Sequence, residues 1–600
     1  MTGVKNRYFL RFKRTVIFSA LTLASNLACA QGAQSSPEWL EALNKDGKPI
    51  TVFTAKQIYT MDPGRPEATA VAVLDGKVLS TGSIESMQPW LSRYDYTIND
   101  TLKDKVITPG FIEPHSHMWM SAGFMSATYI GPLDWPGRDG MQKASPTHAD
   151  VIETLKQTHA NETDKTKPLI AWGFDPANHG GGLNREELDA ISTERPIYVI
   201  GFAPHFVYLN SPAIKATGVT SDTKIHGVYK NSDGTLSGVF NENLAVQAAL
   251  GPVFKDIMAM GGVGGLQFMA NIANKAGVTT VAEMLYGAFD FDAEWNDTLT
   301  ATNNPDFPIR IQLIADGQTM SHKFKDKSLA TYADFLPRNT DKAYVKGIKF
   351  FTDGSLPLMS SKVNYPGYLD GKNGSENAIP WADLTKTMAP YWNKGIQIHI
   401  HANGDMALDQ ALDSLEELQH AKPRFDHRYT IEHFSISNSM QPRRIKALGA
   451  LVSGNPYFTS YRSLLHSEHA YGPDRSEAFG RYGSLAREGV IFALHSDYPQ
   501  VVVPMLPLTA VWTVVNRIAE DGKTVVAPGE AISVERAMRA ITIDAAYTLG
   551  VEDKIGSLEP GKHADFTVLE SDPYKVSPNK IKDVPVWGTV MGGNIFEAKN

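Results

Sequence analysis

Histidine and aspartate recur where short apolar runs end in this chain of 600 residues. One run ends in His115-Ser116-His117, and later runs end close to His401, His433 and Asp497. In extended backbone, residues i and i+2 point to the same side, so the imidazoles of His115 and His117 can face one point. Imidazole and carboxylate suit Zn2+ and similar cations. Each residue alone is more often a surface or core residue, but their recurrence at strand ends favours a metal site.

A cation at this position would allow hydrolysis at neutral pH. A bound divalent metal lowers the pKa of water to about 7, and the resulting hydroxide can attack a carbonyl carbon. Asp497 is our candidate for the group that takes the proton and returns it to the leaving nitrogen. Lys349 also lies late in an apolar run. Its amine fits a metal site only if neutralised, for example by carbamylation, which would let it bridge two cations about 3.5–4 Å apart.

The apolar runs alternate with stretches long enough for helices. Such alternation favours a parallel sheet, and eight units favour an α/β fold with a closed (β/α)8 TIM-like barrel, whose catalytic groups lie at the C-terminal ends of the strands. An open, doubly wound sheet is the alternative. The expected strands lie within residues 106–117, 276–284, 308–315, 344–354, 396–405, 429–436, 450–458 and 490–499.

Further parts are expected around the barrel, which we assign to residues 108–544. Short strands and turns in residues 50–107 and 545–600 predict a composite β-domain, a β-sandwich built from both ends of the chain. The pair Asp75-Gly76 indicates a hairpin in the first of these segments. The long interval between the first two barrel strands predicts an inserted subdomain at about residues 128–260, because structureless loops of that length are rare.

The N-terminus has the pattern of a secretory signal peptide over residues 1–30. Basic residues precede an apolar stretch that ends in Ala28-Cys29-Ala30. This stretch is short for a membrane anchor, and lipidation of Cys29 is an alternative that the sequence leaves open. Cleavage after Ala30 would remove the only cysteine, so a metal would have to be held by nitrogen and oxygen ligands. We therefore expect a secreted, periplasmic protein.

Composition excludes several classes of protein. With 42% hydrophobic and 20% charged residues, the chain is globular rather than disordered or a polytopic membrane protein. A formal net charge of −8, and no long basic run beyond the first residues, argue against a nucleic-acid partner. The expected partner is a small-molecule substrate. No membrane association is expected after signal cleavage, and a homo-oligomer is left open.

Longer motifs give the chain a resemblance to a known family. It resembles the amidohydrolase superfamily, specifically its amidohydrolase-3 branch, which includes N-substituted formamide deformylases. The resemblance covers nearly the whole chain after residue 30. It rests on "VITPGFIEPHSH", "LNREELDAISTERPIYVIGFAPHFVYLNS", "GIKFFTDGS", "IHANGDMALDQAL", "YTIEHF", "ALHSDYP" and "IGSLEPGKHADFTVLESDP". It implies a metal-bearing (β/α)8 barrel with a composite β-domain.

The same resemblance implies a set of metal ligands. It assigns one metal to His115, His117 and Asp497, a second metal to His401 and His433, and a carbamylated bridge to Lys349. His399 lies on the same side of its strand as His401, and we expect it deeper in the barrel interior. The implied cofactor is a divalent metal, with Zn2+ favoured: one ion, or two if Lys349 is carbamylated.

Three more residues are carried over as substrate-binding candidates. His205, in "PHFVYLNS", resembles a histidine at the rim of the family's active site, and Glu242, in "GTLSGVFNEN", matches a family acid. Arg475, in "GPDR", is a candidate for binding a substrate carboxylate through two hydrogen bonds. For each residue, a structural polar role is the alternative. Residues 356–359 read Leu-Pro-Leu-Met where the family usually has Leu-Gly-Ser-Arg, so substrate specificity does not follow from the resemblance.

The sequence therefore predicts a secreted metal-dependent amidohydrolase. It would break a C–N bond in an amide, formamide, carbamoyl or cyclic-amide group by metal-activated hydroxide, with Asp497 as proton shuttle. His433 or His205 would help to stabilise the developing oxyanion. A deaminase, lactonase or esterase with the same site is one alternative. A non-catalytic periplasmic regulatory protein on the barrel scaffold is the other.

Overall fold

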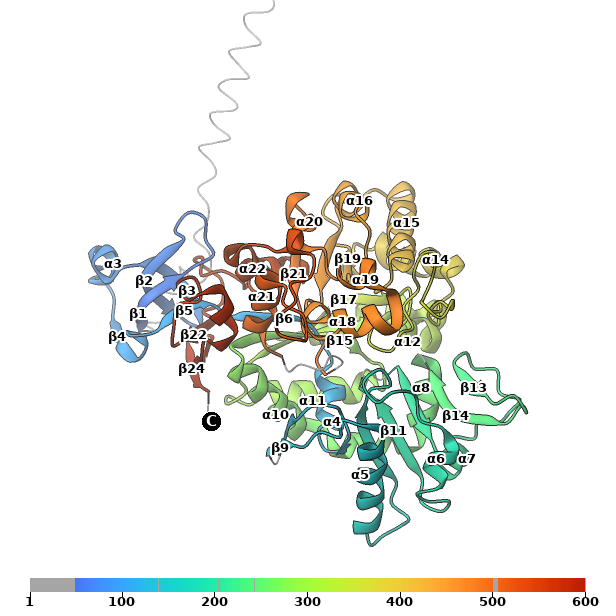
Figure 1. The fold of residues 1–600 in the computed structure, drawn as a ribbon. Helices are drawn as coiled ribbons and strands as arrows, with labels where there is room; N and C mark the ends of the chain where they lie inside the picture. The colour runs from blue at the N-terminus through green and yellow to red at the C-terminus, as the bar shows by residue number, and fades with distance from the viewer. Residues whose placement is uncertain (1–48, 139, 203–204, 242, 500–504, 599–600) are drawn as a thin grey trace, which may run out of the picture.

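A computed structural model describes residues 49–138, 140–202, 205–241, 243–499 and 505–598 of the chain (Figure 1). The expected signal peptide over residues 1–30 and the candidate Glu242 lie outside the described residues. Among the helices in the described ranges, none combines the length and the apolar character needed to cross a bilayer.

Eight parallel strands form the sheet at the centre of the molecule, and they neighbour one another in chain order. Each expected apolar run supplies one of them, and a parallel bridge between Ser116 and Tyr498 joins the segment after the last strand to the first strand. The prediction of a TIM-like barrel is confirmed. The strands are β6 (Phe111–Ser116), β15 (Val278–Tyr286), β16 (Arg310–Asp316), β17 (Ala343–Phe351), β18 (Ile398–Ala402), β19 (Thr430–His433), β20 (Leu451–Gly454) and β21 (Phe492–Leu494).

Amphipathic helices surround this barrel. In α15 (Asp405–Ala421), the buried residues Leu408, Leu412 and Leu415 recur at intervals of three and four, which places them on one face of the helix. This face packs inward, while Asp413 and Glu417 are exposed to solvent. Other helices between or after the barrel strands are α10 (Gly262–Lys275), α11 (Phe291–Thr302), α14 (Trp381–Asn393), α16 (Gln441–Leu448), α22 (Val534–Ala540) and α23 (Ile543–Thr548).

A separate β-sheet is assembled from both ends of the described chain, as expected. In Figure 1 the blue N-terminal strands lie beside the red C-terminal ones. The strand order is β24-β23-β22-β5-β1-β2-β3, with β4 paired to β1. The strands are β1 (Ile50–Tyr59), β2 (Glu67–Leu74), β3 (Lys77–Gly82), β4 (Tyr96–Asn99), β5 (Val106–Pro109), β22 (Phe566–Leu569), β23 (Val586–Met591) and β24 (Asn594–Glu597). Asp75 and Gly76, both with positive φ, form the expected hairpin turn between β2 and β3.

The first expected barrel strand, residues 106–117, is divided between two sheets. Its first part is β5 of the terminal sheet, and its second part is β6 of the barrel. Gly110 separates them, and a Cβ atom at this position would lie 2.0 Å from Oγ1 of Thr279. Only glycine fits this close approach, which periodicity of apolar residues does not reveal.

The interval between β6 and β15 contains the expected inserted subdomain, drawn in teal and green in Figure 1. Its sheet has the order β13-β14-β12-β11-β10-β7. The strands are β7 (Thr128–Tyr129), β10 (Leu169–Phe174), β11 (Ile197–Gly201), β12 (Phe206–Leu209), β13 (Val228–Lys230) and β14 (Leu236–Asn241). A buried ion pair of 2.6 Å between Asp175 and Arg462 joins this subdomain to the barrel. Trp135 also stacks on Tyr498, the residue after Asp497, with ring centroids 5.5 Å apart.

Candidate metal centre

Three of the predicted ligands lie together where β6 ends and after β21. They are His115, His117 and Asp497. Nε2 of His117 lies 3.1 Å from Oδ1 of Asp497, and Nε2 of His115 lies 3.5 Å from the same oxygen. The backbone N–H of Asp497 donates to the carbonyl of His115 at 3.1 Å, so main-chain pairing fixes the position of the carboxylate. Ligand atoms of the three residues lie within 4.8 Å of one another, which is close enough for one cation.

Two residues are held in unusual backbone conformations at this end of the barrel. His433 has φ 74° and Asp497 has φ 57°. Residues other than glycine rarely adopt a left-handed conformation, and such strain tends to occur at functional sites. In this chain it directs one imidazole and one carboxylate into the cluster, where Nδ1 of His433 lies 3.7 Å from Oδ2 of Asp497.

Glu432 and Lys349 orient His115. Nδ1 of His115 lies 2.6 Å from Oε2 of Glu432, so Nδ1–H donates to the carboxylate and Nε2 is the acceptor nitrogen. Nζ of Lys349 lies 2.9 Å from this Nε2. The other carboxylate oxygen of Glu432 lies 2.7 Å from Nδ1 of His399, which is fully buried in the barrel interior. Glu432 therefore connects His115 with His399.

A second candidate group shares His115 with the first. It consists of His115, His433 and His495, whose ligand atoms also lie within 4.8 Å of one another. The ring of His495 stacks on that of His115, with centroids 4.5 Å apart and planes 19° apart. The ring of His433 lies 4.6 Å from that of His115.

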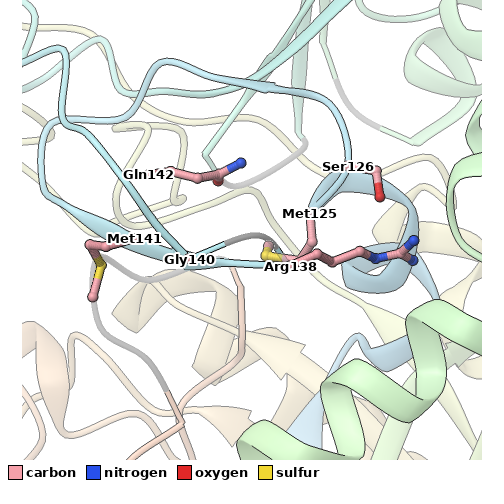
Figure 2. A pocket seen from close by; sticks show the side chains of 6 residues that line it. All are labelled: Met125, Ser126, Arg138, Gly140, Met141 and Gln142. Carbon is pink, nitrogen blue, oxygen red and sulfur yellow. The ribbon is translucent and has the colours of Figure 1, made fainter.

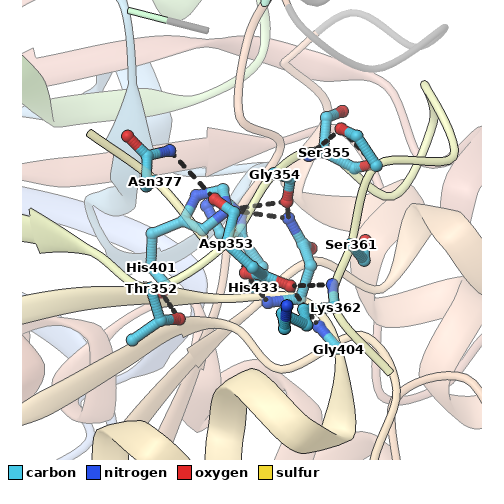
Figure 3. A network of polar contacts seen from close by, with 12 residues as sticks. Thr352, Asp353, Gly354, Ser355, Ser361, Lys362, Asn377, His401, Gly404 and His433 are labelled. Carbon is cyan, nitrogen blue, oxygen red and sulfur yellow. Dashed lines mark hydrogen bonds and ion pairs between the residues drawn. The ribbon is translucent and has the colours of Figure 1, made fainter. Parts of the chain in front are cut away.

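His401 belongs to a hydrogen-bonded network at the ends of β17 and β18 (Figure 3). Its Nε2 lies 3.0 Å from the carbonyl oxygen of Gly354, which leaves Nδ1 for a ligand role. Its ring lies 4.5 Å from that of His433, centroid to centroid. The carboxylate of Asp353 accepts from the backbone N–H groups of Lys362, Asn403 and Gly404 at 2.9, 3.0 and 2.9 Å. It thereby ties the loop after β17 to the loop that follows His401 and β18.

Burial favours the neutral form of four imidazoles of the cluster. It holds the pKa values of His115, His401 and His433 well below the ordinary value, with the charge of Lys349 acting in the same direction. It lowers the pKa of His495 to about 3. A neutral imidazole is the form that binds a metal ion.

The pKa values of three titratable groups beside these imidazoles are shifted for different reasons. Burial lowers the pKa of Lys349 and raises that of Glu113 to about 8. Burial opposes protonation of His117, but the carboxylates of Asp497 and Glu283 raise its pKa. His117 is thus the imidazole of the cluster that carries a proton most readily when no cation is present.

The donor set fits a divalent cation. Both ring nitrogens of His433 and of His495 are buried without a hydrogen-bond partner, and Oδ1 of Asp497 lies 3.1 Å from Nε2 of His117. Leaving a buried polar atom unpaired costs about 1–3 kcal/mol, so several of them at one point require a further binding partner. Neutral imidazoles and a carboxylate are the ligands of zinc and similar metals.

The other sequence-predicted residues lie differently. His205 is beside His401, with ring centroids 6.1 Å apart. The guanidinium of Arg475 donates to the carbonyls of Asn364 and Gly367 at 2.9 and 3.0 Å, which joins α19 (Pro473–Ser476) to the segment after β17. Its binding to a substrate carboxylate stays a prediction.

Sequence reasoning assigned no role to His495, Glu432, Glu283 or Glu113. All four are buried around the predicted ligands. Their positions in the sequence could have identified them. Glu113 and Glu283 lie in barrel strands, and Glu432 and His495 lie within two residues of a predicted ligand. Glu113 accepts from the backbone N–H of Ser496 at 3.0 Å, which links β6 to the segment that carries Asp497.

A cavity of about 490 Å3 lies beside the inserted subdomain (Figure 2). Arg138 at its edge donates to the carbonyls of Ala122 and Gly261. None of the residues of the metal centre lines this cavity. Its lining residues are Met125, Ser126, Arg138, Gly140, Met141 and Gln142.

Comparison with known proteins agrees with this architecture. The chain is 28% identical over 562 residues to the protein LONG AFTER FAR-RED 3 of Arabidopsis thaliana, with 90% of each chain covered. It is 23% identical over 563 residues to an N-substituted formamide deformylase of Arthrobacter pascens, covering 89% of this chain and 96% of the relative. The solved structure of an uncharacterized metal-dependent hydrolase from Pyrococcus horikoshii has the same fold, with a TM-score of 0.64, 20% identity, and coverage of 88% of this chain and 99% of that one.

A family model described as the amidohydrolase family matches residues 101–596, which include the whole barrel. The resemblance noted from the motifs is therefore confirmed: the chain belongs to the amidohydrolase family.

Proposed function

We propose that this protein is a secreted, metal-dependent amidohydrolase that hydrolyses a C–N bond in a small amide, formamide, carbamoyl or cyclic-amide substrate. One observation carries the proposal. His115, His117 and Asp497 come from opposite ends of the barrel sequence, yet their ligand atoms converge within 4.8 Å in a buried site. Membership of the amidohydrolase family and the name of the formamide deformylase relative support the reaction class.

We assign the cation to the cluster around Nε2 of His115, with Zn2+ as the expected ion. When bound, a divalent cation lowers the pKa of a water molecule and polarises the substrate carbonyl. Asp497 has two oxygens with different neighbours, since Oδ1 faces His117 and Oδ2 faces His433. A carboxylate placed in this way can take a proton from water at one oxygen and deliver it to the leaving nitrogen.

The surroundings of Asp497 keep bulk water out of the reaction. The cluster is buried, and Trp135 of the inserted subdomain stacks directly on Tyr498. Exclusion of water strengthens the electrostatic interactions between these side chains and the developing charge. Because His433 is assigned as a ligand, His205, whose ring lies 6.1 Å from that of His401, is the candidate to donate a hydrogen bond to an oxyanion.

Lys349 is the residue that would determine the number of cations. Burial lowers its pKa and so favours the neutral amine, which is the form that reacts with CO2. The amine nitrogen bonds to the carbon of CO2 and releases one proton, giving an anionic carbamate. We propose that this carbamate, when formed, adds oxygen ligands and permits a second cation with His401 and His433.

The direct test is a substrate panel with the purified, zinc-loaded protein. N-substituted formamides, N-acyl amino acids and cyclic amides are compared with matched esters, lactones and amino-purines, and released amine, acid and ammonia are measured. We expect amine release from at least one C–N substrate and none from His117→Ala. Turnover of only esters or lactones would contradict the proposed bond. Absence of any turnover with zinc and bicarbonate present would favour the regulatory alternative.

Secretion is a separate part of the proposal. The basic and apolar pattern of residues 1–30 supports export with cleavage after Ala30. Expression of the full chain in a Gram-negative host, followed by N-terminal sequencing of the periplasmic fraction, should give Gln31 as the first residue. An intact N-terminus in the cytoplasmic fraction would contradict it.

A further inference from the structure

His495 is a buried histidine whose ring has no hydrogen-bond partner at either nitrogen. Its exposed fraction is 1%, and it directly follows barrel strand β21. The carboxylate of Asp497 and the backbone of Ser453 both favour its protonated form, but burial outweighs them. An imidazole in such a place loses its interactions with water and regains no ordinary hydrogen bond in return.

Two buried histidines away from the candidate metal centre, His179 and His427, behave differently. His179 accepts from the backbone N–H of Asp175 at Nδ1, and its Nε2 lies 2.9 Å from the carbonyl oxygen of Ser145. His427 likewise accepts from Tyr429 N–H at Nδ1, and its Nε2 lies 3.0 Å from the carbonyl of Leu448. In these two histidines, which lie away from the candidate metal centre, both nitrogens are therefore paired. His495 lacks this pairing, and it shares the lack with His433.

His495 lies close enough to two other histidines for the three rings to bind one cation. Ligand atoms of His115, His433 and His495 lie within 4.8 Å of one another. The ring of His495 lies 4.5 Å from that of His115 and 5.2 Å from that of His433, centroid to centroid. Three neutral imidazoles at these distances match the ligand number of a tetrahedral site with one open position.

His115 has only one ring nitrogen available to bind a cation. Its Nδ1 is bonded to Glu432, so only Nε2 can bind a cation. The group with His117 and Asp497 and the group with His433 and His495 both depend on this single nitrogen. One cation at Nε2 of His115 therefore has donors from both groups within reach.

We infer that His495 is a cation ligand of this protein, acting with His115 and His433 at the same centre. The inference rests on the proposed metal centre but does not depend on which bond the enzyme breaks. It adds a ligand from the last barrel strand to the set implied by the family resemblance, in which Asp497 is the ligand from that region. It also explains why a buried imidazole is kept where no protein group pairs with it.

The test compares His495→Gln with the wild type in the full-length, metal-free chain. Zinc affinity is measured by competition with a chromophoric chelator, and the number of bound imidazoles by X-ray absorption of the zinc-loaded protein. We expect one imidazole fewer in the variant and an affinity reduced by more than about 100-fold, the upper range for loss of an outer partner. His427→Gln is the matched control, because this equally buried histidine has both nitrogens paired, and its zinc binding should match the wild type.

A second variant guards against a failure to fold. His495→Gly leaves a space that free imidazole can fill, and added imidazole should restore zinc affinity and the imidazole count. A crystal structure of the zinc-loaded wild type gives the same answer without a variant: a ring nitrogen of His495 should lie about 2.0–2.1 Å from the ion.

Three outcomes are informative. An unchanged imidazole count and affinity in His495→Gln, or an ion more than about 3 Å from the ring in the crystal, would overturn the inference. If His117→Ala still lost zinc and hydrolysis in that case, the proposed function would stand. Failure of the wild type to bind zinc would overturn both.

Discussion

Unpaired polar atoms gather at one point of this molecule, on the side chains of His433 and His495. Each such atom carries a cost of desolvation, and a cation bound among them would offset these costs together. Burial adds to the effect by keeping the imidazoles of His433 and His495 neutral. The chemistry proposed here therefore follows from individual atoms rather than from the fold.

Asp497→Asn should abolish turnover while the protein stays folded. The amide is nearly isosteric with the carboxylate but cannot accept a proton, and general base catalysis contributes about 10^2–10^4-fold. The measurement is kcat on the best substrate of the panel, with bound zinc determined in the same samples. A kcat close to that of the wild type would rule out Asp497 as the proton shuttle.

Glu432→Gln should weaken zinc binding without removing a ligand. The carboxylate accepts from Nδ1 of both His115 and His399, and an amide offers only one acceptor oxygen for two donors. Loss of an outer partner of this kind typically costs about 10–100-fold in metal affinity. Chelator competition measures it. Glu530→Gln is the control, since Glu530 is also buried but bonds to Ser484, and equal zinc affinity in both variants would contradict the role of Glu432.

Much of the residue-level site could be predicted, because the ligands follow apolar runs that are recognisable as strands. His115 and His117 are also related by strand alternation, which needs no tertiary information. The contact between Glu432 and His115 could not be predicted, since these residues are 317 positions apart and meet only when the barrel closes. His495 was visible beside Asp497, but nothing in the sequence reveals that its nitrogens are unpaired.

Hydrogen bonds join the loop after β17 to the loop after β18. The loop after β17 contains Asp353, and the loop after β18 contains Asn403 and Gly404, whose N–H groups donate to that carboxylate. Asn403 in turn donates to the carbonyl of Gly354 and accepts from the hydroxyl of Ser435 at 2.6 Å. This network fixes the end of the strand that carries His401.

Asp353→Ala should lower both stability and activity. Three backbone N–H groups would lose their acceptor inside the protein, and we expect a loss of about 3 kcal/mol in the free energy of unfolding. Because the network positions His401, kcat should fall at least about tenfold, and Asp353→Asn, which keeps one acceptor oxygen, should recover part of both. Urea unfolding and kinetics measure these effects.

Asp370→Ala is the control for this network, because Asp370 is an exposed acid that pairs with Lys372 in a loop of the same region. Wild-type stability and kcat in Asp353→Ala would mean that the network does not position His401.

The boundaries of elements were harder to predict than their existence. All eight expected runs overlap a barrel strand, because buried parallel strands are short and largely apolar. The run over residues 106–117 nevertheless supplies strands to two sheets. Its division at Gly110 depends on the position of Thr279, which is distant in sequence.

At the scale of the whole molecule, a buried ion pair joins the barrel to the terminal sheet. Nε and Nη2 of Arg310 in β16 lie 2.8 and 3.2 Å from the two carboxylate oxygens of Asp565. Burial opposes ionisation of Asp565, but the Arg310 charge keeps the pKa of this carboxyl below its ordinary value. The composite sheet was predictable from strands at both chain ends, but this link was not, because the two residues are 255 positions apart and meet only in the folded chain.

Asp565→Asn should destabilise the protein by about 3–5 kcal/mol at neutral pH, since it leaves the Arg310 charge buried and unpaired. A carboxyl whose pKa is lowered by folding contributes stability above its unfolded pKa of about 3.9, and this contribution disappears as the pH falls through the lower folded value. The difference between variant and wild type should therefore shrink below about pH 4. Denaturant unfolding at several pH values measures it.

The exposed pair Asp134–Lys143 is the control, and Asp134→Asn should cost less than about 1 kcal/mol at any pH. A difference that did not depend on pH in Asp565→Asn would show that the ion pair is not its cause.

Zinc titration into the chelator-treated, full-length protein tests the central claim most directly, with bound zinc and hydrolysis of the best C–N substrate followed in the same samples. Activity should rise in proportion to bound zinc, level off at one or two equivalents, and be absent with no tight zinc binding in His117→Ala. Hydrolysis that persists without zinc, or tight zinc binding that survives in His117→Ala, would contradict a catalytic cation at the ends of the barrel strands.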